Sequence, residues 1–259
     1  MKKYELTDET KTLADGTVLH RIRAAMDFTL ADGTPVRKGD LGGWIEREDN
    51  LDHDGSAWVS GKAKVYGKAK VSGEACVSGK AKVSGKAWVC GEAWVGDEAE
   101  VYGKAKVSGK AWVGGNAWVC GEAEVYGKAK VSGKAWVGGN AWVCGEACVS
   151  GNAWVSGNAC VSGEACVSGN AWVSGEACVS GNAWVTSSED YAVFKNSWSS
   201  FRWFTYTRSN RKWKVGCFCG TGEELIAKAY RDSELSGRCY EAIVRAQEAI
   251  DTAKEGGKE

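Results

Sequence analysis

The sequence contains little of several residue types, and it lacks the long apolar segments that membrane spans and export signals need. Among 259 residues it has one proline, two histidines and five phenylalanines. It contains no run of about 18 apolar residues, so no segment is expected to cross a membrane as a helix. The first residues, MKKYELTDET, lack the apolar core and cleavage site of a signal peptide, so we expect no secretion leader. Basic and acidic residues number 33 each, and this balance predicts affinity for neither nucleic acid nor a membrane surface.

The scarcity of histidine also limits the chemistry that can be expected. His20 and His53 are the two histidines, and no Cys-x-x-Cys pair occurs, so a zinc site is not predicted. The sequence has no nucleophile elbow, P-loop or dinucleotide-binding fingerprint. Eleven cysteines, an odd number, argue against a complete disulfide framework and favour free thiols in a reducing cytoplasm. We therefore expect no enzymatic activity, no metal and no cofactor.

What the sequence does contain is a six-residue repeat. Valine recurs every six residues from Val59 to Val185, which makes 22 hexads of the form V-x-G-x-A-x without an insertion. The one departure is at Asp97, which replaces the glycine, while Gly96 supplies one a residue earlier. An uninterrupted period of six is typical of a parallel β-solenoid.

The repeat can be translated into geometry. In Ala-x-Val the outer two side chains point to one face of a short strand and the middle one to the other, so alanine and valine are expected inside. Glycine two residues after valine allows a positive φ at each corner. Three hexads then form one triangular coil, and about seven coils stacked at the strand spacing make a prism about 34 Å long.

The hexads resemble the left-handed parallel β-helix family of hexapeptide-repeat proteins, in which an aliphatic residue is followed four positions later by a small one. The resemblance covers about half of the chain and implies left-handed coils. Many members of that family are acyltransferases, whose reaction uses a general-base histidine on a coil and a loop inserted between coils. Here both histidines precede the first hexad and no loop interrupts the repeat, so the enzyme is the least favoured alternative.

Segments of different composition flank the repeat. We predict a β-rich N-terminal cap at residues 1–54, the β-helix at residues 55–186 and an α+β domain at residues 187–259, because the open ends of a solenoid need covering. The C-terminal domain is expected to hold a three-stranded meander and two helices. A capping box, Thr221 to Glu224, begins the first of these helices.

Outward positions 18 residues apart should lie above one another. The residues before valine then form three columns, and one of them ends in four tryptophans: Trp118, Trp136, Trp154 and Trp172. A structural ladder on a β surface explains such a column. An interface with another copy or a partner explains it as well, because tryptophan is enriched in interface cores. Stacking of sugars or bases is a third possibility.

Two further features of the repeat are stacked cysteines and an internal duplication. Cys148 lies above Cys166 and Cys160 above Cys178 at about the strand spacing, and we expect all four as thiols. Residues 104–127 recur almost unchanged at 128–151, a duplication of four hexads that advances the pattern by one face. Such a step scrambles any constellation on one face and preserves the core, so length and shape matter more than particular residues.

The C-terminal meander contains a second candidate surface, the basic-aromatic hairpin. Its residues alternate cationic and aromatic side chains: Arg202, Trp203, Tyr206, Arg208, Arg211, Lys212, Trp213 and Lys214. Charges that keep an edge hairpin soluble are one explanation. A patch that grips nucleic acid or an acidic protein is the other.

The ends of the chain, LADGTVLHRIRA, KGDLGGWIE and KVGCFCGTGEEL, resemble uncharacterised phage and prophage proteins that place hexapeptide repeats between two similar ends. That resemblance spans the whole chain and implies a virus-encoded protein in a bacterial cytoplasm or a virion. The function predicted is a non-catalytic scaffold or binding protein that forms a homo-oligomer or captures a host or phage protein. The alternative is a phage inhibitor of a host defence system that binds protein, nucleic acid or a signalling nucleotide.

Overall fold

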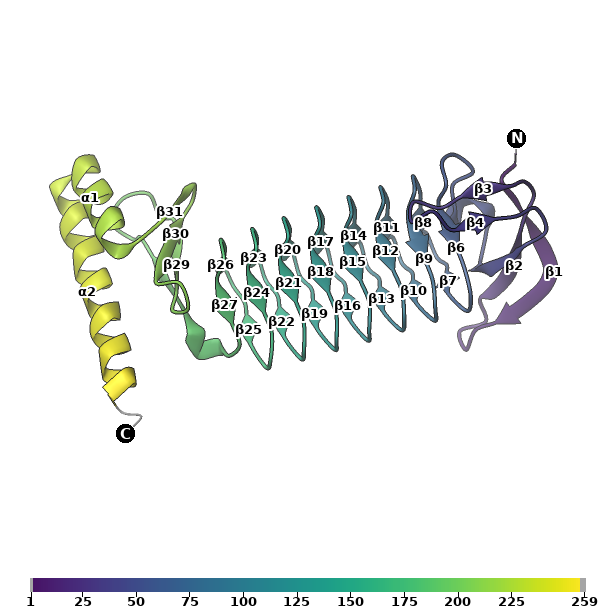
Figure 1. The fold of residues 1–259 in the computed structure, drawn as a ribbon. Coiled ribbons are helices and arrows are strands. Elements are labelled where there is room, and N and C mark those ends of the chain that lie inside the picture. Colours follow the sequence, from purple (N-terminus) through teal and green to yellow (C-terminus); the bar gives the residue numbers. More distant parts are fainter. Residues whose placement is uncertain (1, 257–259) are drawn as a thin grey trace.

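The computed structural model describes residues 2–256 and shows a straight rod with a cap at each end (Figure 1). The N-terminal cap consists of β1 (Tyr4–Thr12), β2 (Val18–Ala24), β3 (Phe28–Thr29), β4 (Pro35–Val36), β5 (Leu41–Ile45) and the 3-10 turn η1 (Glu48–Asn50). β1 pairs antiparallel with β2, and β2 with β5. β3 and β4 form a separate two-stranded ribbon.

The rod is a parallel β-solenoid whose two-residue strands form three sheets, one for each face. The first face has β6 (Trp58–Val59), β9 (Cys76–Val77), β12 (Trp94–Val95), β15 (Trp112–Val113), β18 (Lys130–Val131), β21 (Cys148–Val149), β24 (Cys166–Val167) and β27 (Trp184–Val185). The second face has β7 (Lys64–Val65), β10 (Lys82–Val83), β13 (Glu100–Val101), β16 (Trp118–Val119), β19 (Trp136–Val137), β22 (Trp154–Val155) and β25 (Trp172–Val173). The third face has β8 (Lys70–Val71), β11 (Trp88–Val89), β14 (Lys106–Val107), β17 (Glu124–Val125), β20 (Trp142–Val143), β23 (Cys160–Val161) and β26 (Cys178–Val179).

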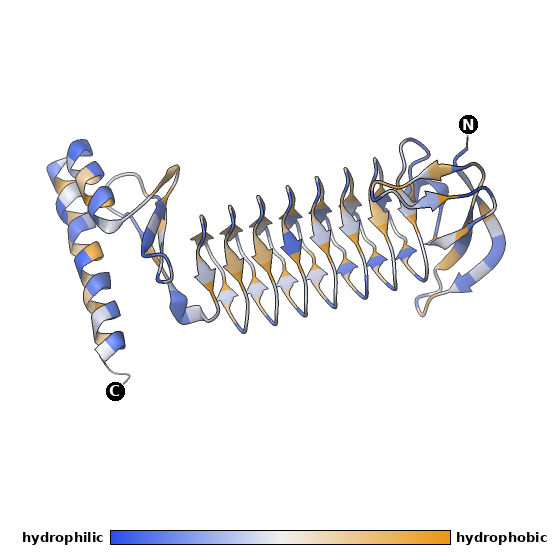
Figure 2. Ribbon diagram, viewed as in Figure 1, coloured by the Kyte–Doolittle hydropathy of each residue, from blue (hydrophilic) through white to orange (hydrophobic). Residues whose placement is uncertain are grey.

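The predicted fold and its 18-residue register are confirmed. Trp118 pairs with Trp136 and Val119 with Val137, and the same offset holds along every face. The repeat valines and alanines are buried almost completely and form one continuous core. Figure 2 shows the same hydropathy pattern on successive coils. Burial of these apolar side chains is the main source of stability in such a stack.

Polar side chains on the surface also follow the coil period. Five lysine–glutamate pairs connect residues 18 apart on neighbouring coils, with nitrogen–oxygen distances between 2.6 and 3.0 Å: Lys80–Glu98, Lys82–Glu100, Lys104–Glu122, Lys110–Glu92 and Lys128–Glu146. Exposed pairs of this kind contribute about 0–1 kcal/mol each. They therefore contribute little to the free energy of unfolding. Each pair forms only when the two neighbouring coils are in the 18-residue register.

The solenoid begins before the first recognisable hexad. β5 pairs parallel with β7, Ile45 opposite Val65, and Leu51 forms a parallel bridge with Val71. These residues complete a coil beneath the first hexads, so the rod has about eight turns where the repeat alone predicts about seven. The extra turn lacks the V-x-G-x-A-x pattern, and spacing alone could not reveal it.

The N-terminal cap covers the first tryptophan of the first face. Trp58 is 3% exposed, and the rings of Phe28 and Tyr4 meet it edge-on at centroid distances of 5.3 and 6.5 Å. The Tyr4 hydroxyl lies within hydrogen-bond distance of the carbonyl oxygens of Glu48 and Leu51, at 2.8 and 2.7 Å. The hairpin and ribbon are thus packed against the first coils.

The C-terminal domain follows the 3-10 turn η2 (Ser188–Asp190). It consists of β28 (Tyr191–Lys195), β29 (Trp203–Thr207), β30 (Lys212–Val215), β31 (Phe218–Gly220), α1 (Gly222–Asp232) and α2 (Glu234–Gly256). The sheet has four strands, one more than the meander predicted, because residues 218–220 turn back onto β30. Thr221 caps α1 as predicted, and both halves of its capping box are formed. The sheet lies between the helices and the last coil (Figure 1).

Candidate functional site: the tryptophan strip

The second face of the rod carries the tryptophan strip, which comprises Trp118, Trp136, Trp154 and Trp172 on four successive coils. The ring centroids of Trp136 and Trp154 are 4.3 Å apart, and those of Trp154 and Trp172 are 6.1 Å apart. Three of the four side chains are between 45% and 57% exposed, whereas Trp136 is half-buried. The structure therefore places the four predicted residues on successive strands of one face, and the rings of Trp136, Trp154 and Trp172 follow one another as neighbours.

The difference in exposure has a local cause two residues along the chain. Trp94, Trp112 and Trp136 are each followed by Val-Gly, and each is half-buried. A Cβ atom added to the following glycine would collide with the indole ring. The missing side chain therefore allows the ring to lie down over the corner of its own coil.

Where a larger residue occupies that corner, the tryptophan stands out into solvent. Trp88, Trp118, Trp142, Trp154, Trp172 and Trp184 are followed by Val-Cys, Val-Ser or Val-Thr, and all are at least 45% exposed. In two cases the indole instead uses a serine on the preceding coil: the Nε1–H of Trp88 donates to Ser72 Oγ at 2.9 Å and that of Trp172 to Ser156 Oγ at 3.5 Å. The residue after valine thus determines the orientation of the indole ring. The column of tryptophans by itself does not reveal this orientation.

Asparagine side chains flank the tryptophan strip along both of its edges. Asn152 Nδ2 donates to Asn170 Oδ1 at 3.1 Å on one edge, and Asn140 Nδ2 to Asn158 Oδ1 at 3.2 Å on the other. Residues 137–185 contain no lysine or arginine. The surface around the C-terminal half of the strip is consequently aromatic and amide-bearing, and its charge is acidic: Glu176 Oε1 accepts from Asn158 Nδ2 at 2.7 Å.

Exposed tryptophans also occur outside the strip, but they are separated. Trp142 on the third face is 51% exposed and lies between Glu124 and Cys160. Trp184 on the first face is 64% exposed and ends its column. Trp94 and Trp112 stack with ring centroids 5.2 Å apart, half-buried. The second face is thus the one on which four tryptophans follow one another.

The basic-aromatic hairpin is arranged differently from the surface that its sequence predicts. Tyr206 and Trp213 are 5% and 2% exposed and belong to the core of the C-terminal domain, together with Phe204. β29 is covered on both sides, since these rings contact the helices and Thr205 contacts the last coil. The two predicted rings are therefore not available to a ligand at the surface.

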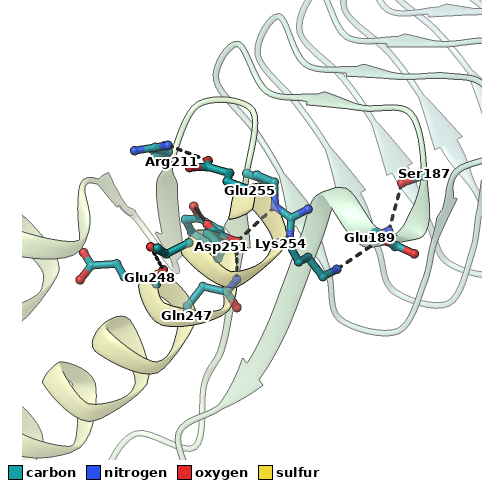
Figure 3. A network of polar contacts seen from close by, with 11 residues as sticks. Ser187, Glu189, Arg211, Gln247, Glu248, Asp251, Lys254 and Glu255 are labelled. Atoms are coloured by element: carbon teal, nitrogen blue, oxygen red, sulfur yellow. Dashed lines mark hydrogen bonds and ion pairs between the residues drawn. The ribbon is translucent and has the colours of Figure 1, made fainter. Parts of the chain in front are cut away.

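Two of the hairpin's cations are also committed to partners on α2. Arg208 Nε lies 3.1 Å from Asp251 Oδ1. Arg211 Nη2 lies 3.0 Å from Glu255 Oε1, and Figure 3 shows this pair. The Tyr206 hydroxyl also donates to Asp251, and burial raises the pKa of Tyr206 above its ordinary range. Trp203, Arg202 and Lys212 remain exposed, and Lys214 is half-exposed. The hairpin is therefore chiefly the attachment site of α2.

Of the two predicted pairs of stacked thiols, Cys148 and Cys166 lie in register on the first face, and the other pair lies on the third face next to the C-terminal domain. Cys160 pairs in register with Cys178, and all eleven cysteines are free thiols. The Cys178 thiol hydrogen-bonds to Cys160 and holds the pKa of Cys160 below its ordinary value, and the nearby Lys214 ammonium acts in the same direction. Burial raises the pKa of Cys76, at the other end of the rod, to about 11. The cysteines therefore differ in nucleophilicity at neutral pH.

Within residues 2–256, no cluster of three or more histidine, cysteine or acidic side chains is arranged to hold a metal ion. In the same range, neither α1 nor α2 is apolar enough over a sufficient length to cross a bilayer. A scan against protein-family models finds no match to this chain, and a search of curated proteins finds no similar sequence.

Proposed function

We propose that this protein is a non-catalytic β-solenoid scaffold that self-associates through the tryptophan strip on its second face. The observation that carries the proposal is the run of four tryptophans on successive coils of one face, three of them about half exposed or more. Large exposed aromatic surfaces of this kind are typical of interaction sites. Tryptophan in particular is a frequent anchor of protein interfaces.

A second copy of the same chain is the occupant best supported by charge and shape. The flanks of the strip are mostly asparagine, with Glu122, Lys134 and Glu176 as their charged residues, so two copies bring few ions together. The chain has zero formal net charge, which removes long-range repulsion between copies. A straight face also allows the same surface to meet itself around a two-fold axis, the commonest symmetry of homo-oligomers.

The test changes two central indoles and measures mass in solution. The variant with Trp136→Lys and Trp154→Lys places two cations in the middle of the strip, and the control Trp142→Lys changes an indole on the third face that is about as exposed as Trp154. In multi-angle light scattering we expect wild type and control to have at least twice the chain mass of 27.6 kDa, and the double variant to have that mass itself. An unchanged mass in the double variant, or a monomeric wild type, would contradict the proposal.

The biological setting is part of the same proposal. The resemblance of both chain ends to phage and prophage proteins supports a virus-encoded scaffold in a bacterial cytoplasm or virion. Free cysteines suit a reducing compartment. Host or phage proteins would then be further candidates for capture on the remaining faces.

A further inference from the structure

A cleft in the C-terminal domain lies apart from the tryptophan strip. It has a volume of about 390 Å³ and is enclosed by the β28–β29 loop, β30, β31 and both helices. Its apolar lining comes from Val215, Phe218, Leu225 and Ala229. Ligand sites commonly combine such an apolar lining with a few polar groups that converge on one point.

The polar groups of this cleft are organised by Asn196. The side chain of Asn196 is 1% exposed, and its Oδ1 accepts from the backbone N–H groups of Trp198 and Ser199 at 3.1 and 2.9 Å. Its backbone N–H donates to the carbonyl oxygen of Arg202 at 2.9 Å, which closes the loop. The loop is thus closed by three hydrogen bonds of Asn196.

The Nδ2 group of Asn196 lies among three hydroxyl groups of the cleft. Its two hydrogens are shared by Ser199 Oγ at 2.8 Å, Ser200 Oγ at 3.2 Å and the Tyr240 hydroxyl oxygen at 3.2 Å. A hydroxyl group that accepts from this amide can still donate its own proton to another acceptor. Tyr240 is 7% exposed, so its hydroxyl is held at the wall of the cleft by Asn196.

Two cations border the same cleft. Arg202 comes from the loop and Lys228 from α1, and across the described part of the chain neither has an ion-pair partner. One carboxylate, Asp232, also lines the cleft, so the two cations leave one positive charge in excess. Gly216 lies beside Arg202, and a Cβ atom at that position would be 3.2 Å from the guanidinium.

From these groups we infer that the cleft binds a small organic oxyanion, with its charged head at Arg202, Lys228 and the three hydroxyl groups and its apolar body against Phe218 and Leu225. Carboxylates and phosphates share the required chemistry, since both accept several hydrogen bonds and carry negative charge. The hydroxyl groups held around Asn196, the unpaired cations and the apolar lining are all accounted for by one such ligand. The site uses none of the tryptophans proposed for self-association.

The experiment is isothermal titration calorimetry of the full chain with three probes that contain the same phenyl ring. Phenyl phosphate and benzoate carry the two kinds of oxyanion, and phenol carries none. We expect at least one of the anions to bind once per chain, and phenol to give no binding. The anion that binds more tightly identifies the head group. Absence of binding by both anions at millimolar concentration, or equal binding of phenol, would overturn the inference.

Variants locate the bound anion within the domain. Arg202→Gln removes one cation and is expected to weaken binding about tenfold or more. Tyr240→Phe keeps the ring and removes the hydroxyl donor, and we expect a several-fold loss. Lys212→Gln, an exposed lysine of the same hairpin outside the cleft, should leave affinity within twofold. Equal affinity in wild type and Arg202→Gln would show that the anion binds elsewhere. Ser199→Ala serves as a second hydroxyl variant, and it would overturn the assignment if both hydroxyl changes leave affinity unaltered.

Discussion

The backbone N–H of Cys178, in the last strand of the third face, donates to the Oγ1 atom of Thr205 in β29 at 2.8 Å. In every earlier coil the corresponding N–H donates to an alanine carbonyl on the next coil, and here no next coil exists. The other two faces end in the same way, because Trp172 N–H donates to Ser188 Oγ at 3.2 Å and Trp184 N–H to Ser209 Oγ at 2.7 Å. Three hydroxyl groups thus replace the missing coil.

Loss of the Thr205 acceptor should loosen the end of the rod. Thr205→Val keeps the shape of the side chain but leaves the Cys178 N–H without its partner, and we expect a loss of about 1–2 kcal/mol in the free energy of unfolding. Urea denaturation measures this loss, and hydrogen exchange should show faster exchange at the last coil. Thr10→Val, at an exposed position of β1, is the control and should change stability little. Unaltered exchange at Cys178 in Thr205→Val would show that the hydroxyl is not the cap.

The corner residue after Trp136-Val137 should control the position of the indole. Gly138→Ser introduces a Cβ atom where the ring of Trp136 now lies, so we expect the ring to swing outward. With 5-fluorotryptophan incorporated, the ¹⁹F resonance of Trp136 should become more sensitive to solvent. The resonances of Trp94 and Trp112, whose corners are unchanged, are internal controls. A Trp136 resonance as shielded as before would exclude this steric explanation.

The one non-glycine corner of the repeat should depend on its carboxylate. Asp97 has a left-handed φ of 55°, and its Oδ2 accepts from the Gly115 N–H at 2.8 Å. Asp97→Ala keeps the unfavourable backbone and removes the hydrogen bond, so we expect a loss of about 1–2 kcal/mol in unfolding free energy. Asp97→Gly loses the bond but relieves the backbone, and it should be the more stable of the two variants. Thermal denaturation that ranks alanine equal to or above glycine would contradict this account.

Alkylation rates should separate two half-buried cysteines. The reacting species is the thiolate, whose fraction rises as the pH passes the pKa of the thiol. The pKa of Cys160 is lowered and that of Cys76 is raised to about 11, so Cys160 should react with iodoacetamide faster at pH 7. As the pH increases from 7 to 10, the rate at Cys76 should keep rising while the rate at Cys160 levels off.

A charge variant provides the control for this difference. Lys214→Gln removes the cation near Cys160 and should slow alkylation there, while Cys76, at the other end of the rod, keeps its rate. Peptide mass spectrometry reports both sites in one sample. Equal rates at Cys160 and Cys76 at pH 7 would rule out the proposed electrostatic difference.

The repeat made most of the rod predictable. Each hexad determines which residues are buried, where the chain turns and which residues become neighbours after 18 positions, so the tryptophan strip follows from spacing alone. The additional coil containing Ile45 and Leu51 does not follow, because pairing with Val65 and Val71 stabilises it without the repeated sequence. Tertiary contact replaces the local pattern there.

The C-terminal domain shows the limit of the same approach. Alternation along β29 predicts two faces, but only the fold shows that helices cover Tyr206 on one side and that the last coil covers Thr205 on the other. The cleft is likewise assembled from a loop, two strands and two helices. No spacing in the sequence relates Arg202 to Lys228 or Tyr240, so its hydroxyl groups could be recognised only from their hydrogen bonds.

The three faces have a geometric consequence for the relative positions of the two ends. One hexad advances the chain by a third of a turn and about 1.6 Å along the rod. Because the C-terminal domain is fastened to the last strand of each face, it turns with that coil. The 24-residue duplication therefore rotated the C-terminal domain by about 120° around the rod axis relative to the N-terminal hairpin while lengthening the rod by only about 6 Å. A change in the number of hexads therefore alters the angle between the two end domains strongly and the distance between them only slightly.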